Sequence, residues 1–334
     1  MLCRLLCLVS FMGLALVSIT HADESDQYMV WGIELADAAP TINAYVNERI
    51  VGSLGRINES NPDCDCETLT TGVFTDIYQD RLRANLTDFI EFTQSIEVYP
   101  ARDVIPGEII DQSIYRNALV SITIRVTRNI RIGEVYLGTD KLNHFFGIGR
   151  RYYTRYLASL KAGRSQAEAE DEAILWGILT ENTFLGSSTN GIFSIADLES
   201  NYQGFRLAQG LCAGDSPYIV HQQGKWTIFR PIDLRDYVDP TFDESFNPSL
   251  YAGLLRGAVL KVVEEIHAPK AGFPALAARF NAYRSTLPPS SRSLALIRRH
   301  LEENAIPAQR PSLMKALGIS DSDPAAPMDV LKPE

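Results

Sequence analysis

The sequence predicts a mostly α-helical fold, a helical bundle with a small antiparallel β element (α+β). In most segments apolar residues recur every three or four positions, which is the spacing of one face of an α-helix. Strict alternation of apolar and polar residues is clearest in Val120–Thr127, the pattern of a half-buried strand. No internal repeat or linker-like stretch divides the chain, so we expect one domain over residues 23–319.

Residues 1–22 have the features of a secretory signal peptide. Arg4 precedes an apolar run from Leu5 to Ile19, and Ala22 ends the segment before an acidic stretch. The run is shorter than the roughly 20 residues that a membrane-spanning helix needs. We therefore expect cleavage after Ala22, a periplasmic or secreted location, and no transmembrane segment in the mature chain.

The net charge is −10, with no Lys- or Arg-rich stripe that could neutralise phosphates. Nucleic acid is therefore not an expected partner. The chain also lacks a Gly-rich phosphate loop, a nucleophile elbow and a His-Glu-x-x-His motif, which argues against nucleotide binding and the common serine and zinc hydrolases. The export signal makes a cell-envelope component the expected partner.

Three cysteines remain after the expected cleavage. Cys64 and Cys66 lie close together, and Cys212 is far along the chain. Export to an oxidising compartment favours one disulfide, between Cys212 and either Cys64 or Cys66. A zinc site at Cys64 and Cys66 would need a fourth ligand that the spacing does not supply.

Several helices and two β segments can be located from periodicity and capping residues. Ser165 with Glu168 forms a capping box, and Ser194 with Asp197 caps another helix. Strand 120–127 could pair with 130–137, and a hairpin is expected at 218–229. The expected helices span about 39–57, 67–82, 140–160, 166–185, 195–209, 248–267 (with Asn247 as its cap), 273–286, 290–303 and 311–317. The acidic stretch 233–244 is expected to be a solvated loop, and residues 320–334 a disordered tail.

A set of polar residues lies on three consecutive helices of this prediction. Asp140 and His144 share a face four positions apart, as do Asp197 and Asn201. Glu181 stands out because its helical neighbours are apolar, so its side chain should point into the core. A buried carboxylate must be paired, protonated or bound to a cation, since burying it alone costs several kcal/mol.

Glycines accompany these polar residues on each helix. Gly147 follows His144 by three positions, Gly177 precedes Glu181 by four, and Gly204 follows Asn201 by three. Because glycine destabilises a helix, its presence at matching places indicates that the helices approach closely there. We therefore expect the polar residues to converge on one site.

The combined pattern resembles two families, the VanZ-like proteins linked to teicoplanin resistance and the YfiM-like envelope proteins. They share Asp-Lys-x-x-His, a later Glu, and Ser-x-x-Asp-x-x-x-Asn with a following Gly. The matching positions here are Asp140, Lys141, His144, Glu181, Ser194, Asp197, Asn201 and Gly204. The chain also resembles a group of exported proteobacterial proteins with Gly-Thr-Asp-Lys-x-x-His-Phe-Phe and Phe-Ser-x-x-Asp-Leu. The resemblance covers residues 138–204 and implies an envelope setting without a particular reaction.

One property of the VanZ-like family does not carry over. Its helices are embedded in lipid, whereas the helix expected at 140–160 and the residue after it carry four basic side chains that lipid tolerates poorly. These are Arg150, Arg151, Arg155 and Lys161.

Three functions can accommodate a buried Glu181. The favoured one is a structural polar network that holds three helices together, with His144 cationic between carboxylates. The second is a metal-dependent or acid–base hydrolase-like enzyme acting on an envelope substrate. Its catalytic residues would be Glu181, His144, Asp140 and Asp197, its divalent-metal ligands His144, Glu181 and Asp197, and its binding residues Lys141, Asn201 and Ser194. The third is a module that binds a glycan or lipid head group through Tyr152, Tyr153 and Tyr156.

Overall fold

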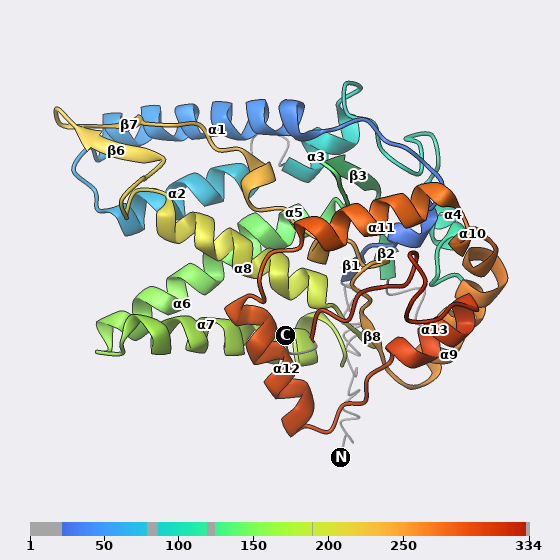
Figure 1. Ribbon diagram of the computed structural model, residues 1–334. Coiled ribbons are helices and arrows are strands. Elements are labelled where there is room, and N and C mark those ends of the chain that lie inside the picture. The colour runs from blue at the N-terminus through green and yellow to red at the C-terminus, as the bar shows by residue number, and fades with distance from the viewer. Residues whose placement is uncertain (1–21, 79–85, 119–123, 189, 332–334) are drawn as a thin grey trace, which may run out of the picture.

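The expected mostly α-helical fold is confirmed. A computed structural model describes residues 22–78, 86–118, 124–188 and 190–331 (Figure 1), so nearly all of the expected leader lies outside the described residues. The helices are α1 (Ala39–Ser60), α2 (Cys66–Tyr78), α3 (Leu86–Phe92), α4 (Pro106–Gln112), α5 (Asp140–Asn143), α6 (Gly149–Lys161), α7 (Gln166–Thr180), α8 (Ile195–Gly210), α9 (Gly253–Val262), α10 (Ala268–Ala271), α11 (Pro274–Thr286), α12 (Arg292–Glu303) and α13 (Arg310–Leu317). π-helical turns occupy His144–Ile148, Glu181–Leu185 and Val263–His267.

The β structure consists of two-stranded pairs. Antiparallel pairs join β3 (Asn129–Ile132) to β4 (Val135–Gly138), β5 (Ile192–Phe193) to β8 (Leu250–Tyr251), and β6 (Ile219–Gln222) to β7 (Lys225–Ile228). The β6–β7 pair is the hairpin that the sequence predicts. A further pair, β1 (Ala22–Glu24) with β2 (Ile124–Val126), is parallel.

The predicted pairing of 120–127 with 130–137 is wrong. Residues 120–123 lie outside the described residues, and β2 pairs with β1 from the start of the chain. Residues 130–137 instead fold back on themselves as the β3–β4 hairpin. The turn between these strands contains Gly133 at φ +58°, a conformation that glycine adopts without steric cost.

The three helices of the polar site pack against one another. The helix from Asp140 to Lys161 is continuous through its π-helical turn, and its α6 part contacts both α7 and α8 (Figure 1). Ser165 caps α7 in a complete capping box, as the sequence predicts. Ser194 caps α8 by accepting a hydrogen bond from the backbone N–H of Asp197. The expected limits of all three helices agree with the structure to within a few residues.

Two of the three glycines lie where the three helices of the polar site meet one another. A Cβ on Gly204 of α8 would lie 1.8 Å from the backbone oxygen of Phe145, so α8 and the π-helical turn touch through their backbones. A Cβ on Gly177 of α7 would lie 1.6 Å from the hydroxyl of Tyr152. Gly147 instead faces Tyr78 of α2, so its predicted place beside the polar site is wrong.

Gly204→Ala should reduce the free energy of unfolding by about 1–3 kcal/mol, because the new methyl group overpacks a backbone contact. Gly210→Ala is the matched control in the same helix, since no atom lies within 4 Å of its added Cβ. Its stability should stay the same or rise slightly through higher helix propensity. Urea denaturation of both variants measures the difference, and equal stabilities would contradict the close approach.

Two segments near the C-terminus differ from expectation. The helix predicted at 248–267 begins only at Gly253, because Leu250 and Tyr251 pair with β5. Asn247 donates its side-chain hydrogen bond to the Thr241 backbone oxygen at 2.8 Å instead of capping a helix. Residues 320–331, expected to be disordered, lie against the core: Ala325 and Ala326 are buried, and the Met328 N–H donates to the Phe246 oxygen at 2.7 Å.

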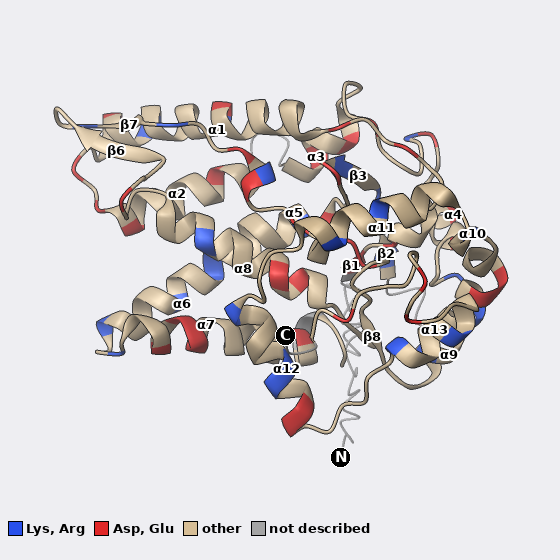
Figure 2. Cartoon of the chain, in the orientation of Figure 1, with Lys and Arg blue, Asp and Glu red and all other residues tan. Residues whose placement is uncertain are grey.

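Charged residues of both signs are spread over the described elements. Figure 2 shows Lys and Arg interspersed with Asp and Glu along the helices. A smaller number of charged residues is buried, and these include Asp140, Lys141, Asp197 and Glu244.

Candidate functional site

The centre of the polar site is Lys141, which is fully buried. Its Nζ lies 2.7 Å from Asp140 Oδ2, 2.6 Å from Asp197 Oδ1 and 2.9 Å from Glu244 Oε1. Burial alone would lower the pKa of Lys141, but these three carboxylates outweigh it and raise the pKa well above its ordinary value. Lys141 is therefore a permanent internal cation. We call the assembly around it the Lys141 cluster: Lys141, Asp140, Asp197, Glu244, Ser194, His144, Asn201, Glu181 and Glu24.

Ser194 connects three members of the cluster. Its hydroxyl donates to Glu244 Oε1 at 2.6 Å and accepts from the Asp197 N–H at 3.1 Å. Its own backbone N–H donates to Glu181 Oε1 at 3.0 Å. The cap of α8 therefore also fixes the positions of two buried carboxyl groups.

His144 is the more exposed side of the cluster, with 15% of its side chain accessible. Its Nε2 lies 3.4 Å from Asp197 Oδ2, and its Nδ1 lies 3.1 Å from Asn201 Oδ1. Burial would raise the pKa of Asp197, but His144 and Lys141 together hold it below its ordinary value. Asp197 therefore remains a carboxylate between two partners.

Glu181 is buried, as its apolar helical face predicts, with 2% of its surface exposed. Burial, followed by the charge of Asp197, raises the pKa of Glu181 well above its ordinary value. Both effects favour the protonated form of this carboxyl group, and its Oε1 accepts the hydrogen bond from the Ser194 backbone N–H. Protonation is one of the three ways in which a buried carboxyl group can be satisfied.

Two π-helical turns begin at members of the cluster. One starts at His144 and the other at Glu181. Such turns are rare inside helices and occur frequently at functional sites, because the extra residue redirects the side chains of that turn. The helices that carry His144 and Glu181 are therefore locally distorted where the cluster forms.

Glu244 was missed by the sequence reasoning. The acidic stretch 233–244 was expected to be a solvated loop, but Asp243 and Glu244 at its end are buried. Phe242 and Phe246 on either side are fully buried, so the aromatic pair around Asp243 and Glu244 was the available signal. The prediction of a solvated loop is wrong for this end of the stretch.

Glu24 was also missed. It ends β1 and is buried, and its Oε1 accepts a hydrogen bond from Asn190 Nδ2 at 2.5 Å. Burial, followed by the charges of Asp197 and Glu244, raises the pKa of Glu24. Glu24 lies in a short acidic stretch of the sequence, which does not predict burial. Its burial depends on the pairing of β1 with β2, about a hundred residues away in the sequence.

The expected divalent-metal ligands His144, Glu181 and Asp197 do not form a metal site. In the ranges that the structure describes, no three His, Cys, Asp or Glu side chains are arranged to hold an ion. Lys141 Nζ lies among the carboxylates at the place where a bound cation would otherwise balance them. Lys141, which the sequence analysis assigns to substrate binding, is therefore the cation of the cluster.

The tyrosines proposed as a binding rim lie in the interior. Tyr152, Tyr153 and Tyr156 expose 0%, 5% and 9% of their surfaces. Tyr152 packs edge-on against Trp176, and Tyr156 packs edge-on against Phe205. Tyr152 and Tyr156 thus join α6 to α7 and α8, and the three tyrosines do not form an accessible surface.

A disulfide joins Cys66 at the start of α2 to Cys212 just beyond α8. Of the two pairings that the sequence allows, the structure contains the one with Cys66. Cys64 is a buried free cysteine, and burial raises the pKa of its thiol. The bond fixes α2 to the end of the helix that carries Asp197 and Asn201.

A second buried carboxyl group on α8 makes stability depend on pH. Burial, followed by the charge of Asp239, raises the pKa of Glu199 from 4.5 to about 8. The folded chain therefore binds a proton that the unfolded chain releases above pH 4.5. The stability that this group contributes is complete below pH 4.5 and is lost as the pH rises toward 8, by up to about 1.4 kcal/mol per pH unit.

Glu199→Gln should remove most of that loss, because glutamine keeps the shape and carries no charge. Its advantage over the unmodified chain should grow as the pH rises from 5 to 8, measured by urea denaturation at each pH. Glu303→Gln, at the exposed end of α12, is the control. Its free energy of unfolding should change with pH in the same way as that of the unmodified chain. If the free energies of unfolding of Glu199→Gln and the unmodified chain differed by a constant amount across this pH range, the raised pKa of Glu199 would be contradicted.

In the described part of the chain no helix has both the length and the apolar character needed to cross a membrane. No family model matches the chain, and neither a curated protein nor a solved structure matches it. The interpretation of the site therefore rests on its own geometry.

Proposed function

We propose that the chain is an exported cell-envelope protein, periplasmic or secreted, in which the Lys141 cluster has a structural role. The leader-like residues 1–22 and the Cys66–Cys212 disulfide support export, because disulfides persist in oxidising compartments. The resemblance to VanZ-like and YfiM-like proteins, carried by residues 138–204, supports the envelope setting.

The observation that carries the structural role is the burial of the Lys141 ammonium group among three carboxylates. Lysine has three N–H donors, and three carboxylates lie within 2.9 Å of Nζ. They come from α5, from α8 and from the segment before β8, which are distant in sequence. An ammonium group that is fully buried among three carboxylates holds these three segments in one arrangement.

A second candidate is an acid–base hydrolase-like enzyme acting on an envelope substrate. It is favoured by the π-helical turns at His144 and Glu181 and by the partial exposure of His144. In this case His144, positioned by Asp197 and Asn201, would transfer the proton, and Glu181 would serve as a buried acid. Asp140 would hold Lys141 in place. The glycan or lipid head-group module loses its support because its tyrosines are buried.

Two variants separate the candidates. In the structural role, His144→Ala should reduce the free energy of unfolding by about 1–2 kcal/mol, because the buried Asp197 carboxylate loses a polar partner. Glu181→Gln should change stability less, since glutamine keeps the shape of the side chain and its amide oxygen can still accept the hydrogen bond from the Ser194 N–H. His221→Ala, on the exposed β6–β7 hairpin, is the control and should change little.

The metal content of the purified mature protein completes the test. The structural role predicts no stoichiometric divalent metal in the unmodified protein and none in either variant. A stoichiometric metal that is lost in His144→Ala while the fold and stability are retained would overturn the structural role and favour the enzyme.

A further inference from the structure

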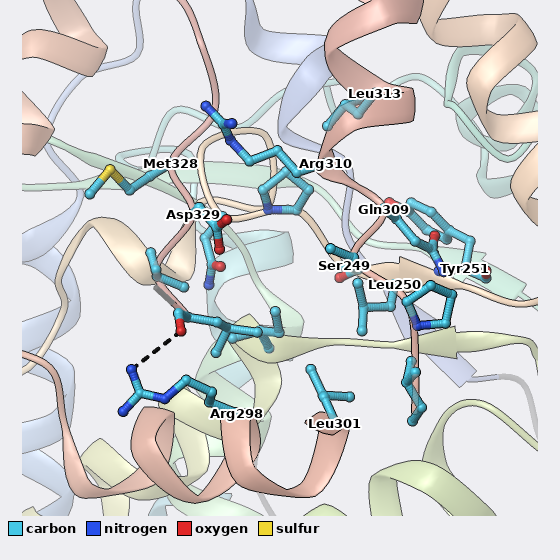
Figure 3. Close-up of a pocket in the computed structure, with 18 of the residues that line it drawn as sticks. Ser249, Leu250, Tyr251, Arg298, Leu301, Gln309, Arg310, Leu313, Met328 and Asp329 are labelled. Atoms are coloured by element: carbon cyan, nitrogen blue, oxygen red, sulfur yellow. Dashed lines mark hydrogen bonds between the residues drawn. The ribbon is translucent and has the colours of Figure 1, made fainter. Parts of the chain in front are cut away.

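A cavity of about 300 Å³ lies beside the Lys141 cluster and is distinct from it. Ile195, which lines it, directly follows Ser194, and the lining segment Asn247–Tyr251 begins three residues after Glu244. Figure 3 shows the cavity between α12, α13 and the segment Met328–Leu331 near the C-terminus. None of its lining residues belongs to the Lys141 cluster.

The lining is mainly aliphatic. It includes Ile195, Leu250, Leu260, Leu301, Leu313 and Val330. Tyr251 is the aromatic residue among the lining residues, and its backbone N–H and oxygen are both engaged by the Gln309 side chain, at 2.9 and 2.8 Å. The backbone N–H and oxygen of Tyr251 therefore already have hydrogen-bond partners. A flexible hydrocarbon chain fits such walls better than a flat ring, which aromatic side chains usually flank.

Two polar side-chain atoms of the lining residues lack a hydrogen-bond partner among the described residues, the Ser249 Oγ and the Tyr251 hydroxyl. The Tyr251 ring packs edge-on against Tyr115, so Ser249 is the group that a ligand would meet. Ser249 is 2% exposed, and its Oγ has no hydrogen-bond partner among the described residues. In Figure 3 Ser249 and Leu250 lie between Leu313 on one side of the cavity and Leu301 on the other. A buried hydroxyl left without a partner costs about 1–3 kcal/mol, so a polar atom of a ligand in the cavity would satisfy it.

The charges around the cavity balance. Arg298 and Arg310 line it together with Glu302 and Asp329, which gives no net charge. Arg310 is already held by Asp321 and by the Pro327 oxygen at 2.9 Å, and Arg298 donates to the Leu331 oxygen at 3.4 Å. A rim of this kind is complementary to a neutral polar group and gives a carboxylate no advantage.

We propose that this cavity binds an aliphatic chain that ends in a neutral hydrogen-bonding group, an alcohol or an ester oxygen, which meets the Ser249 hydroxyl. The volume accommodates about ten heavy atoms, at the roughly 30 Å³ that a water molecule occupies in the liquid. Such a chain can belong to a free aliphatic alcohol or ester, or to an envelope lipid. The proposal does not depend on the role of the Lys141 cluster.

Isothermal titration calorimetry with a series of 1-alkanols from four to twelve carbons tests the proposal. Each added methylene should tighten the Kd about fourfold until the cavity is filled near eight to ten carbons, after which the gain should stop. Decanoate should bind more weakly than 1-decanol. Methyl decanoate and a decanoyl lysophospholipid distinguish a free ligand from a lipid-borne one, and binding of either supports the proposal.

Three variants locate the binding in this cavity. Ser249→Ala should weaken the Kd for 1-decanol about three- to tenfold, through loss of one hydrogen bond. Ala308→Phe, which adds a ring to a lining residue, should weaken it at least tenfold. Leu254→Ala changes a leucine on α9 that is 81% exposed and outside the lining, and should leave the Kd unchanged.

Several results would overturn the proposal. They are the absence of binding at every chain length, a Kd that does not depend on chain length, and tighter binding of decanoate than of 1-decanol. Unchanged binding in both Ser249→Ala and Ala308→Phe, when circular dichroism shows them folded, would place the ligand elsewhere and would equally overturn it.

Discussion

Replacing Lys141 by methionine is expected to reduce the free energy of unfolding by about 3–5 kcal/mol, the cost of breaking a buried ion pair by removing one partner. Methionine retains much of the length and apolar stem of lysine, so the substitution mainly removes the charge. Asp140, Asp197 and Glu244 would then lie close together without their shared cation. Their mutual repulsion, added to their desolvation, is the physical reason for the loss.

Lys161→Met is the matched control for this prediction. Lys161 also contacts a carboxylate, Glu67 at 2.5 Å, but its side chain is 68% exposed. Exposed ion pairs contribute little to stability, so this variant should unfold at nearly the same urea concentration as the unmodified chain. Similar losses in the two variants would mean that burial of Lys141 does not matter.

Removal of the Cys66–Cys212 disulfide is expected to reduce the free energy of unfolding by about 4–5 kcal/mol. The two cysteines are 146 positions apart, so the bond closes a long loop and removes much of the conformational entropy of the unfolded chain. The double variant Cys66→Ala with Cys212→Ala should therefore have a clearly lower midpoint of urea denaturation. Reduction of the unmodified protein should lower the midpoint by a similar amount.

Cys64→Ala is the control, because Cys64 is buried and carries no disulfide. Its loss should be about 1 kcal/mol, the effect of removing one small buried side chain. If Cys64→Ala were as unstable as the double variant, or if reduction left the denaturation midpoint of Cys64→Ala unchanged, the pairing of Cys212 with Cys66 would be wrong.

Features that depend on local sequence could be predicted. The capping box at Ser165 and the cap at Ser194 mark the starts of α7 and α8, because a cap needs only residues within one turn. The burial of Glu181 follows from the apolar residues on its helical face. Gly177 and Gly204 indicate close contacts between helices for a similar reason. Glycine destabilises a helix, and it is needed at these positions because a Cβ would overlap an atom of the neighbouring helix.

Features that depend on distant contacts could not be predicted. Strand β2 pairs with β1 about a hundred residues earlier, and the alternating pattern of 120–127 says nothing about its partner. Glu24 and Glu244 enter the site through such long-range contacts, so the sequence identifies four of the six carboxyl and imidazole groups of the Lys141 cluster. The late start of α9 has the same origin, because Leu250 and Tyr251 pair with β5.

The sequence does not show that Lys141 is the centre of the site. Lys141 was expected only to bind a substrate, whereas the catalytic and metal-binding roles were assigned to acidic residues and His144. A lysine beside an aspartate near a helix start is usually solvated, and only the three-dimensional arrangement shows that it is fully buried. Lys141 places a cation among the carboxylates of the cluster, within 2.9 Å of three of them. The cluster then explains why helices α5 and α8 and the segment before β8 come together.

A double-mutant cycle between Lys141→Met and Glu244→Gln tests this explanation most directly. Urea denaturation gives the free energy of unfolding of the unmodified chain, the two single variants and the double variant. We expect Glu244→Gln to cost at least about 2 kcal/mol less in the Lys141→Met background, because it then removes a repelling charge. Effects that add to within about 0.5 kcal/mol would show that Lys141 and Glu244 do not interact and would contradict the account.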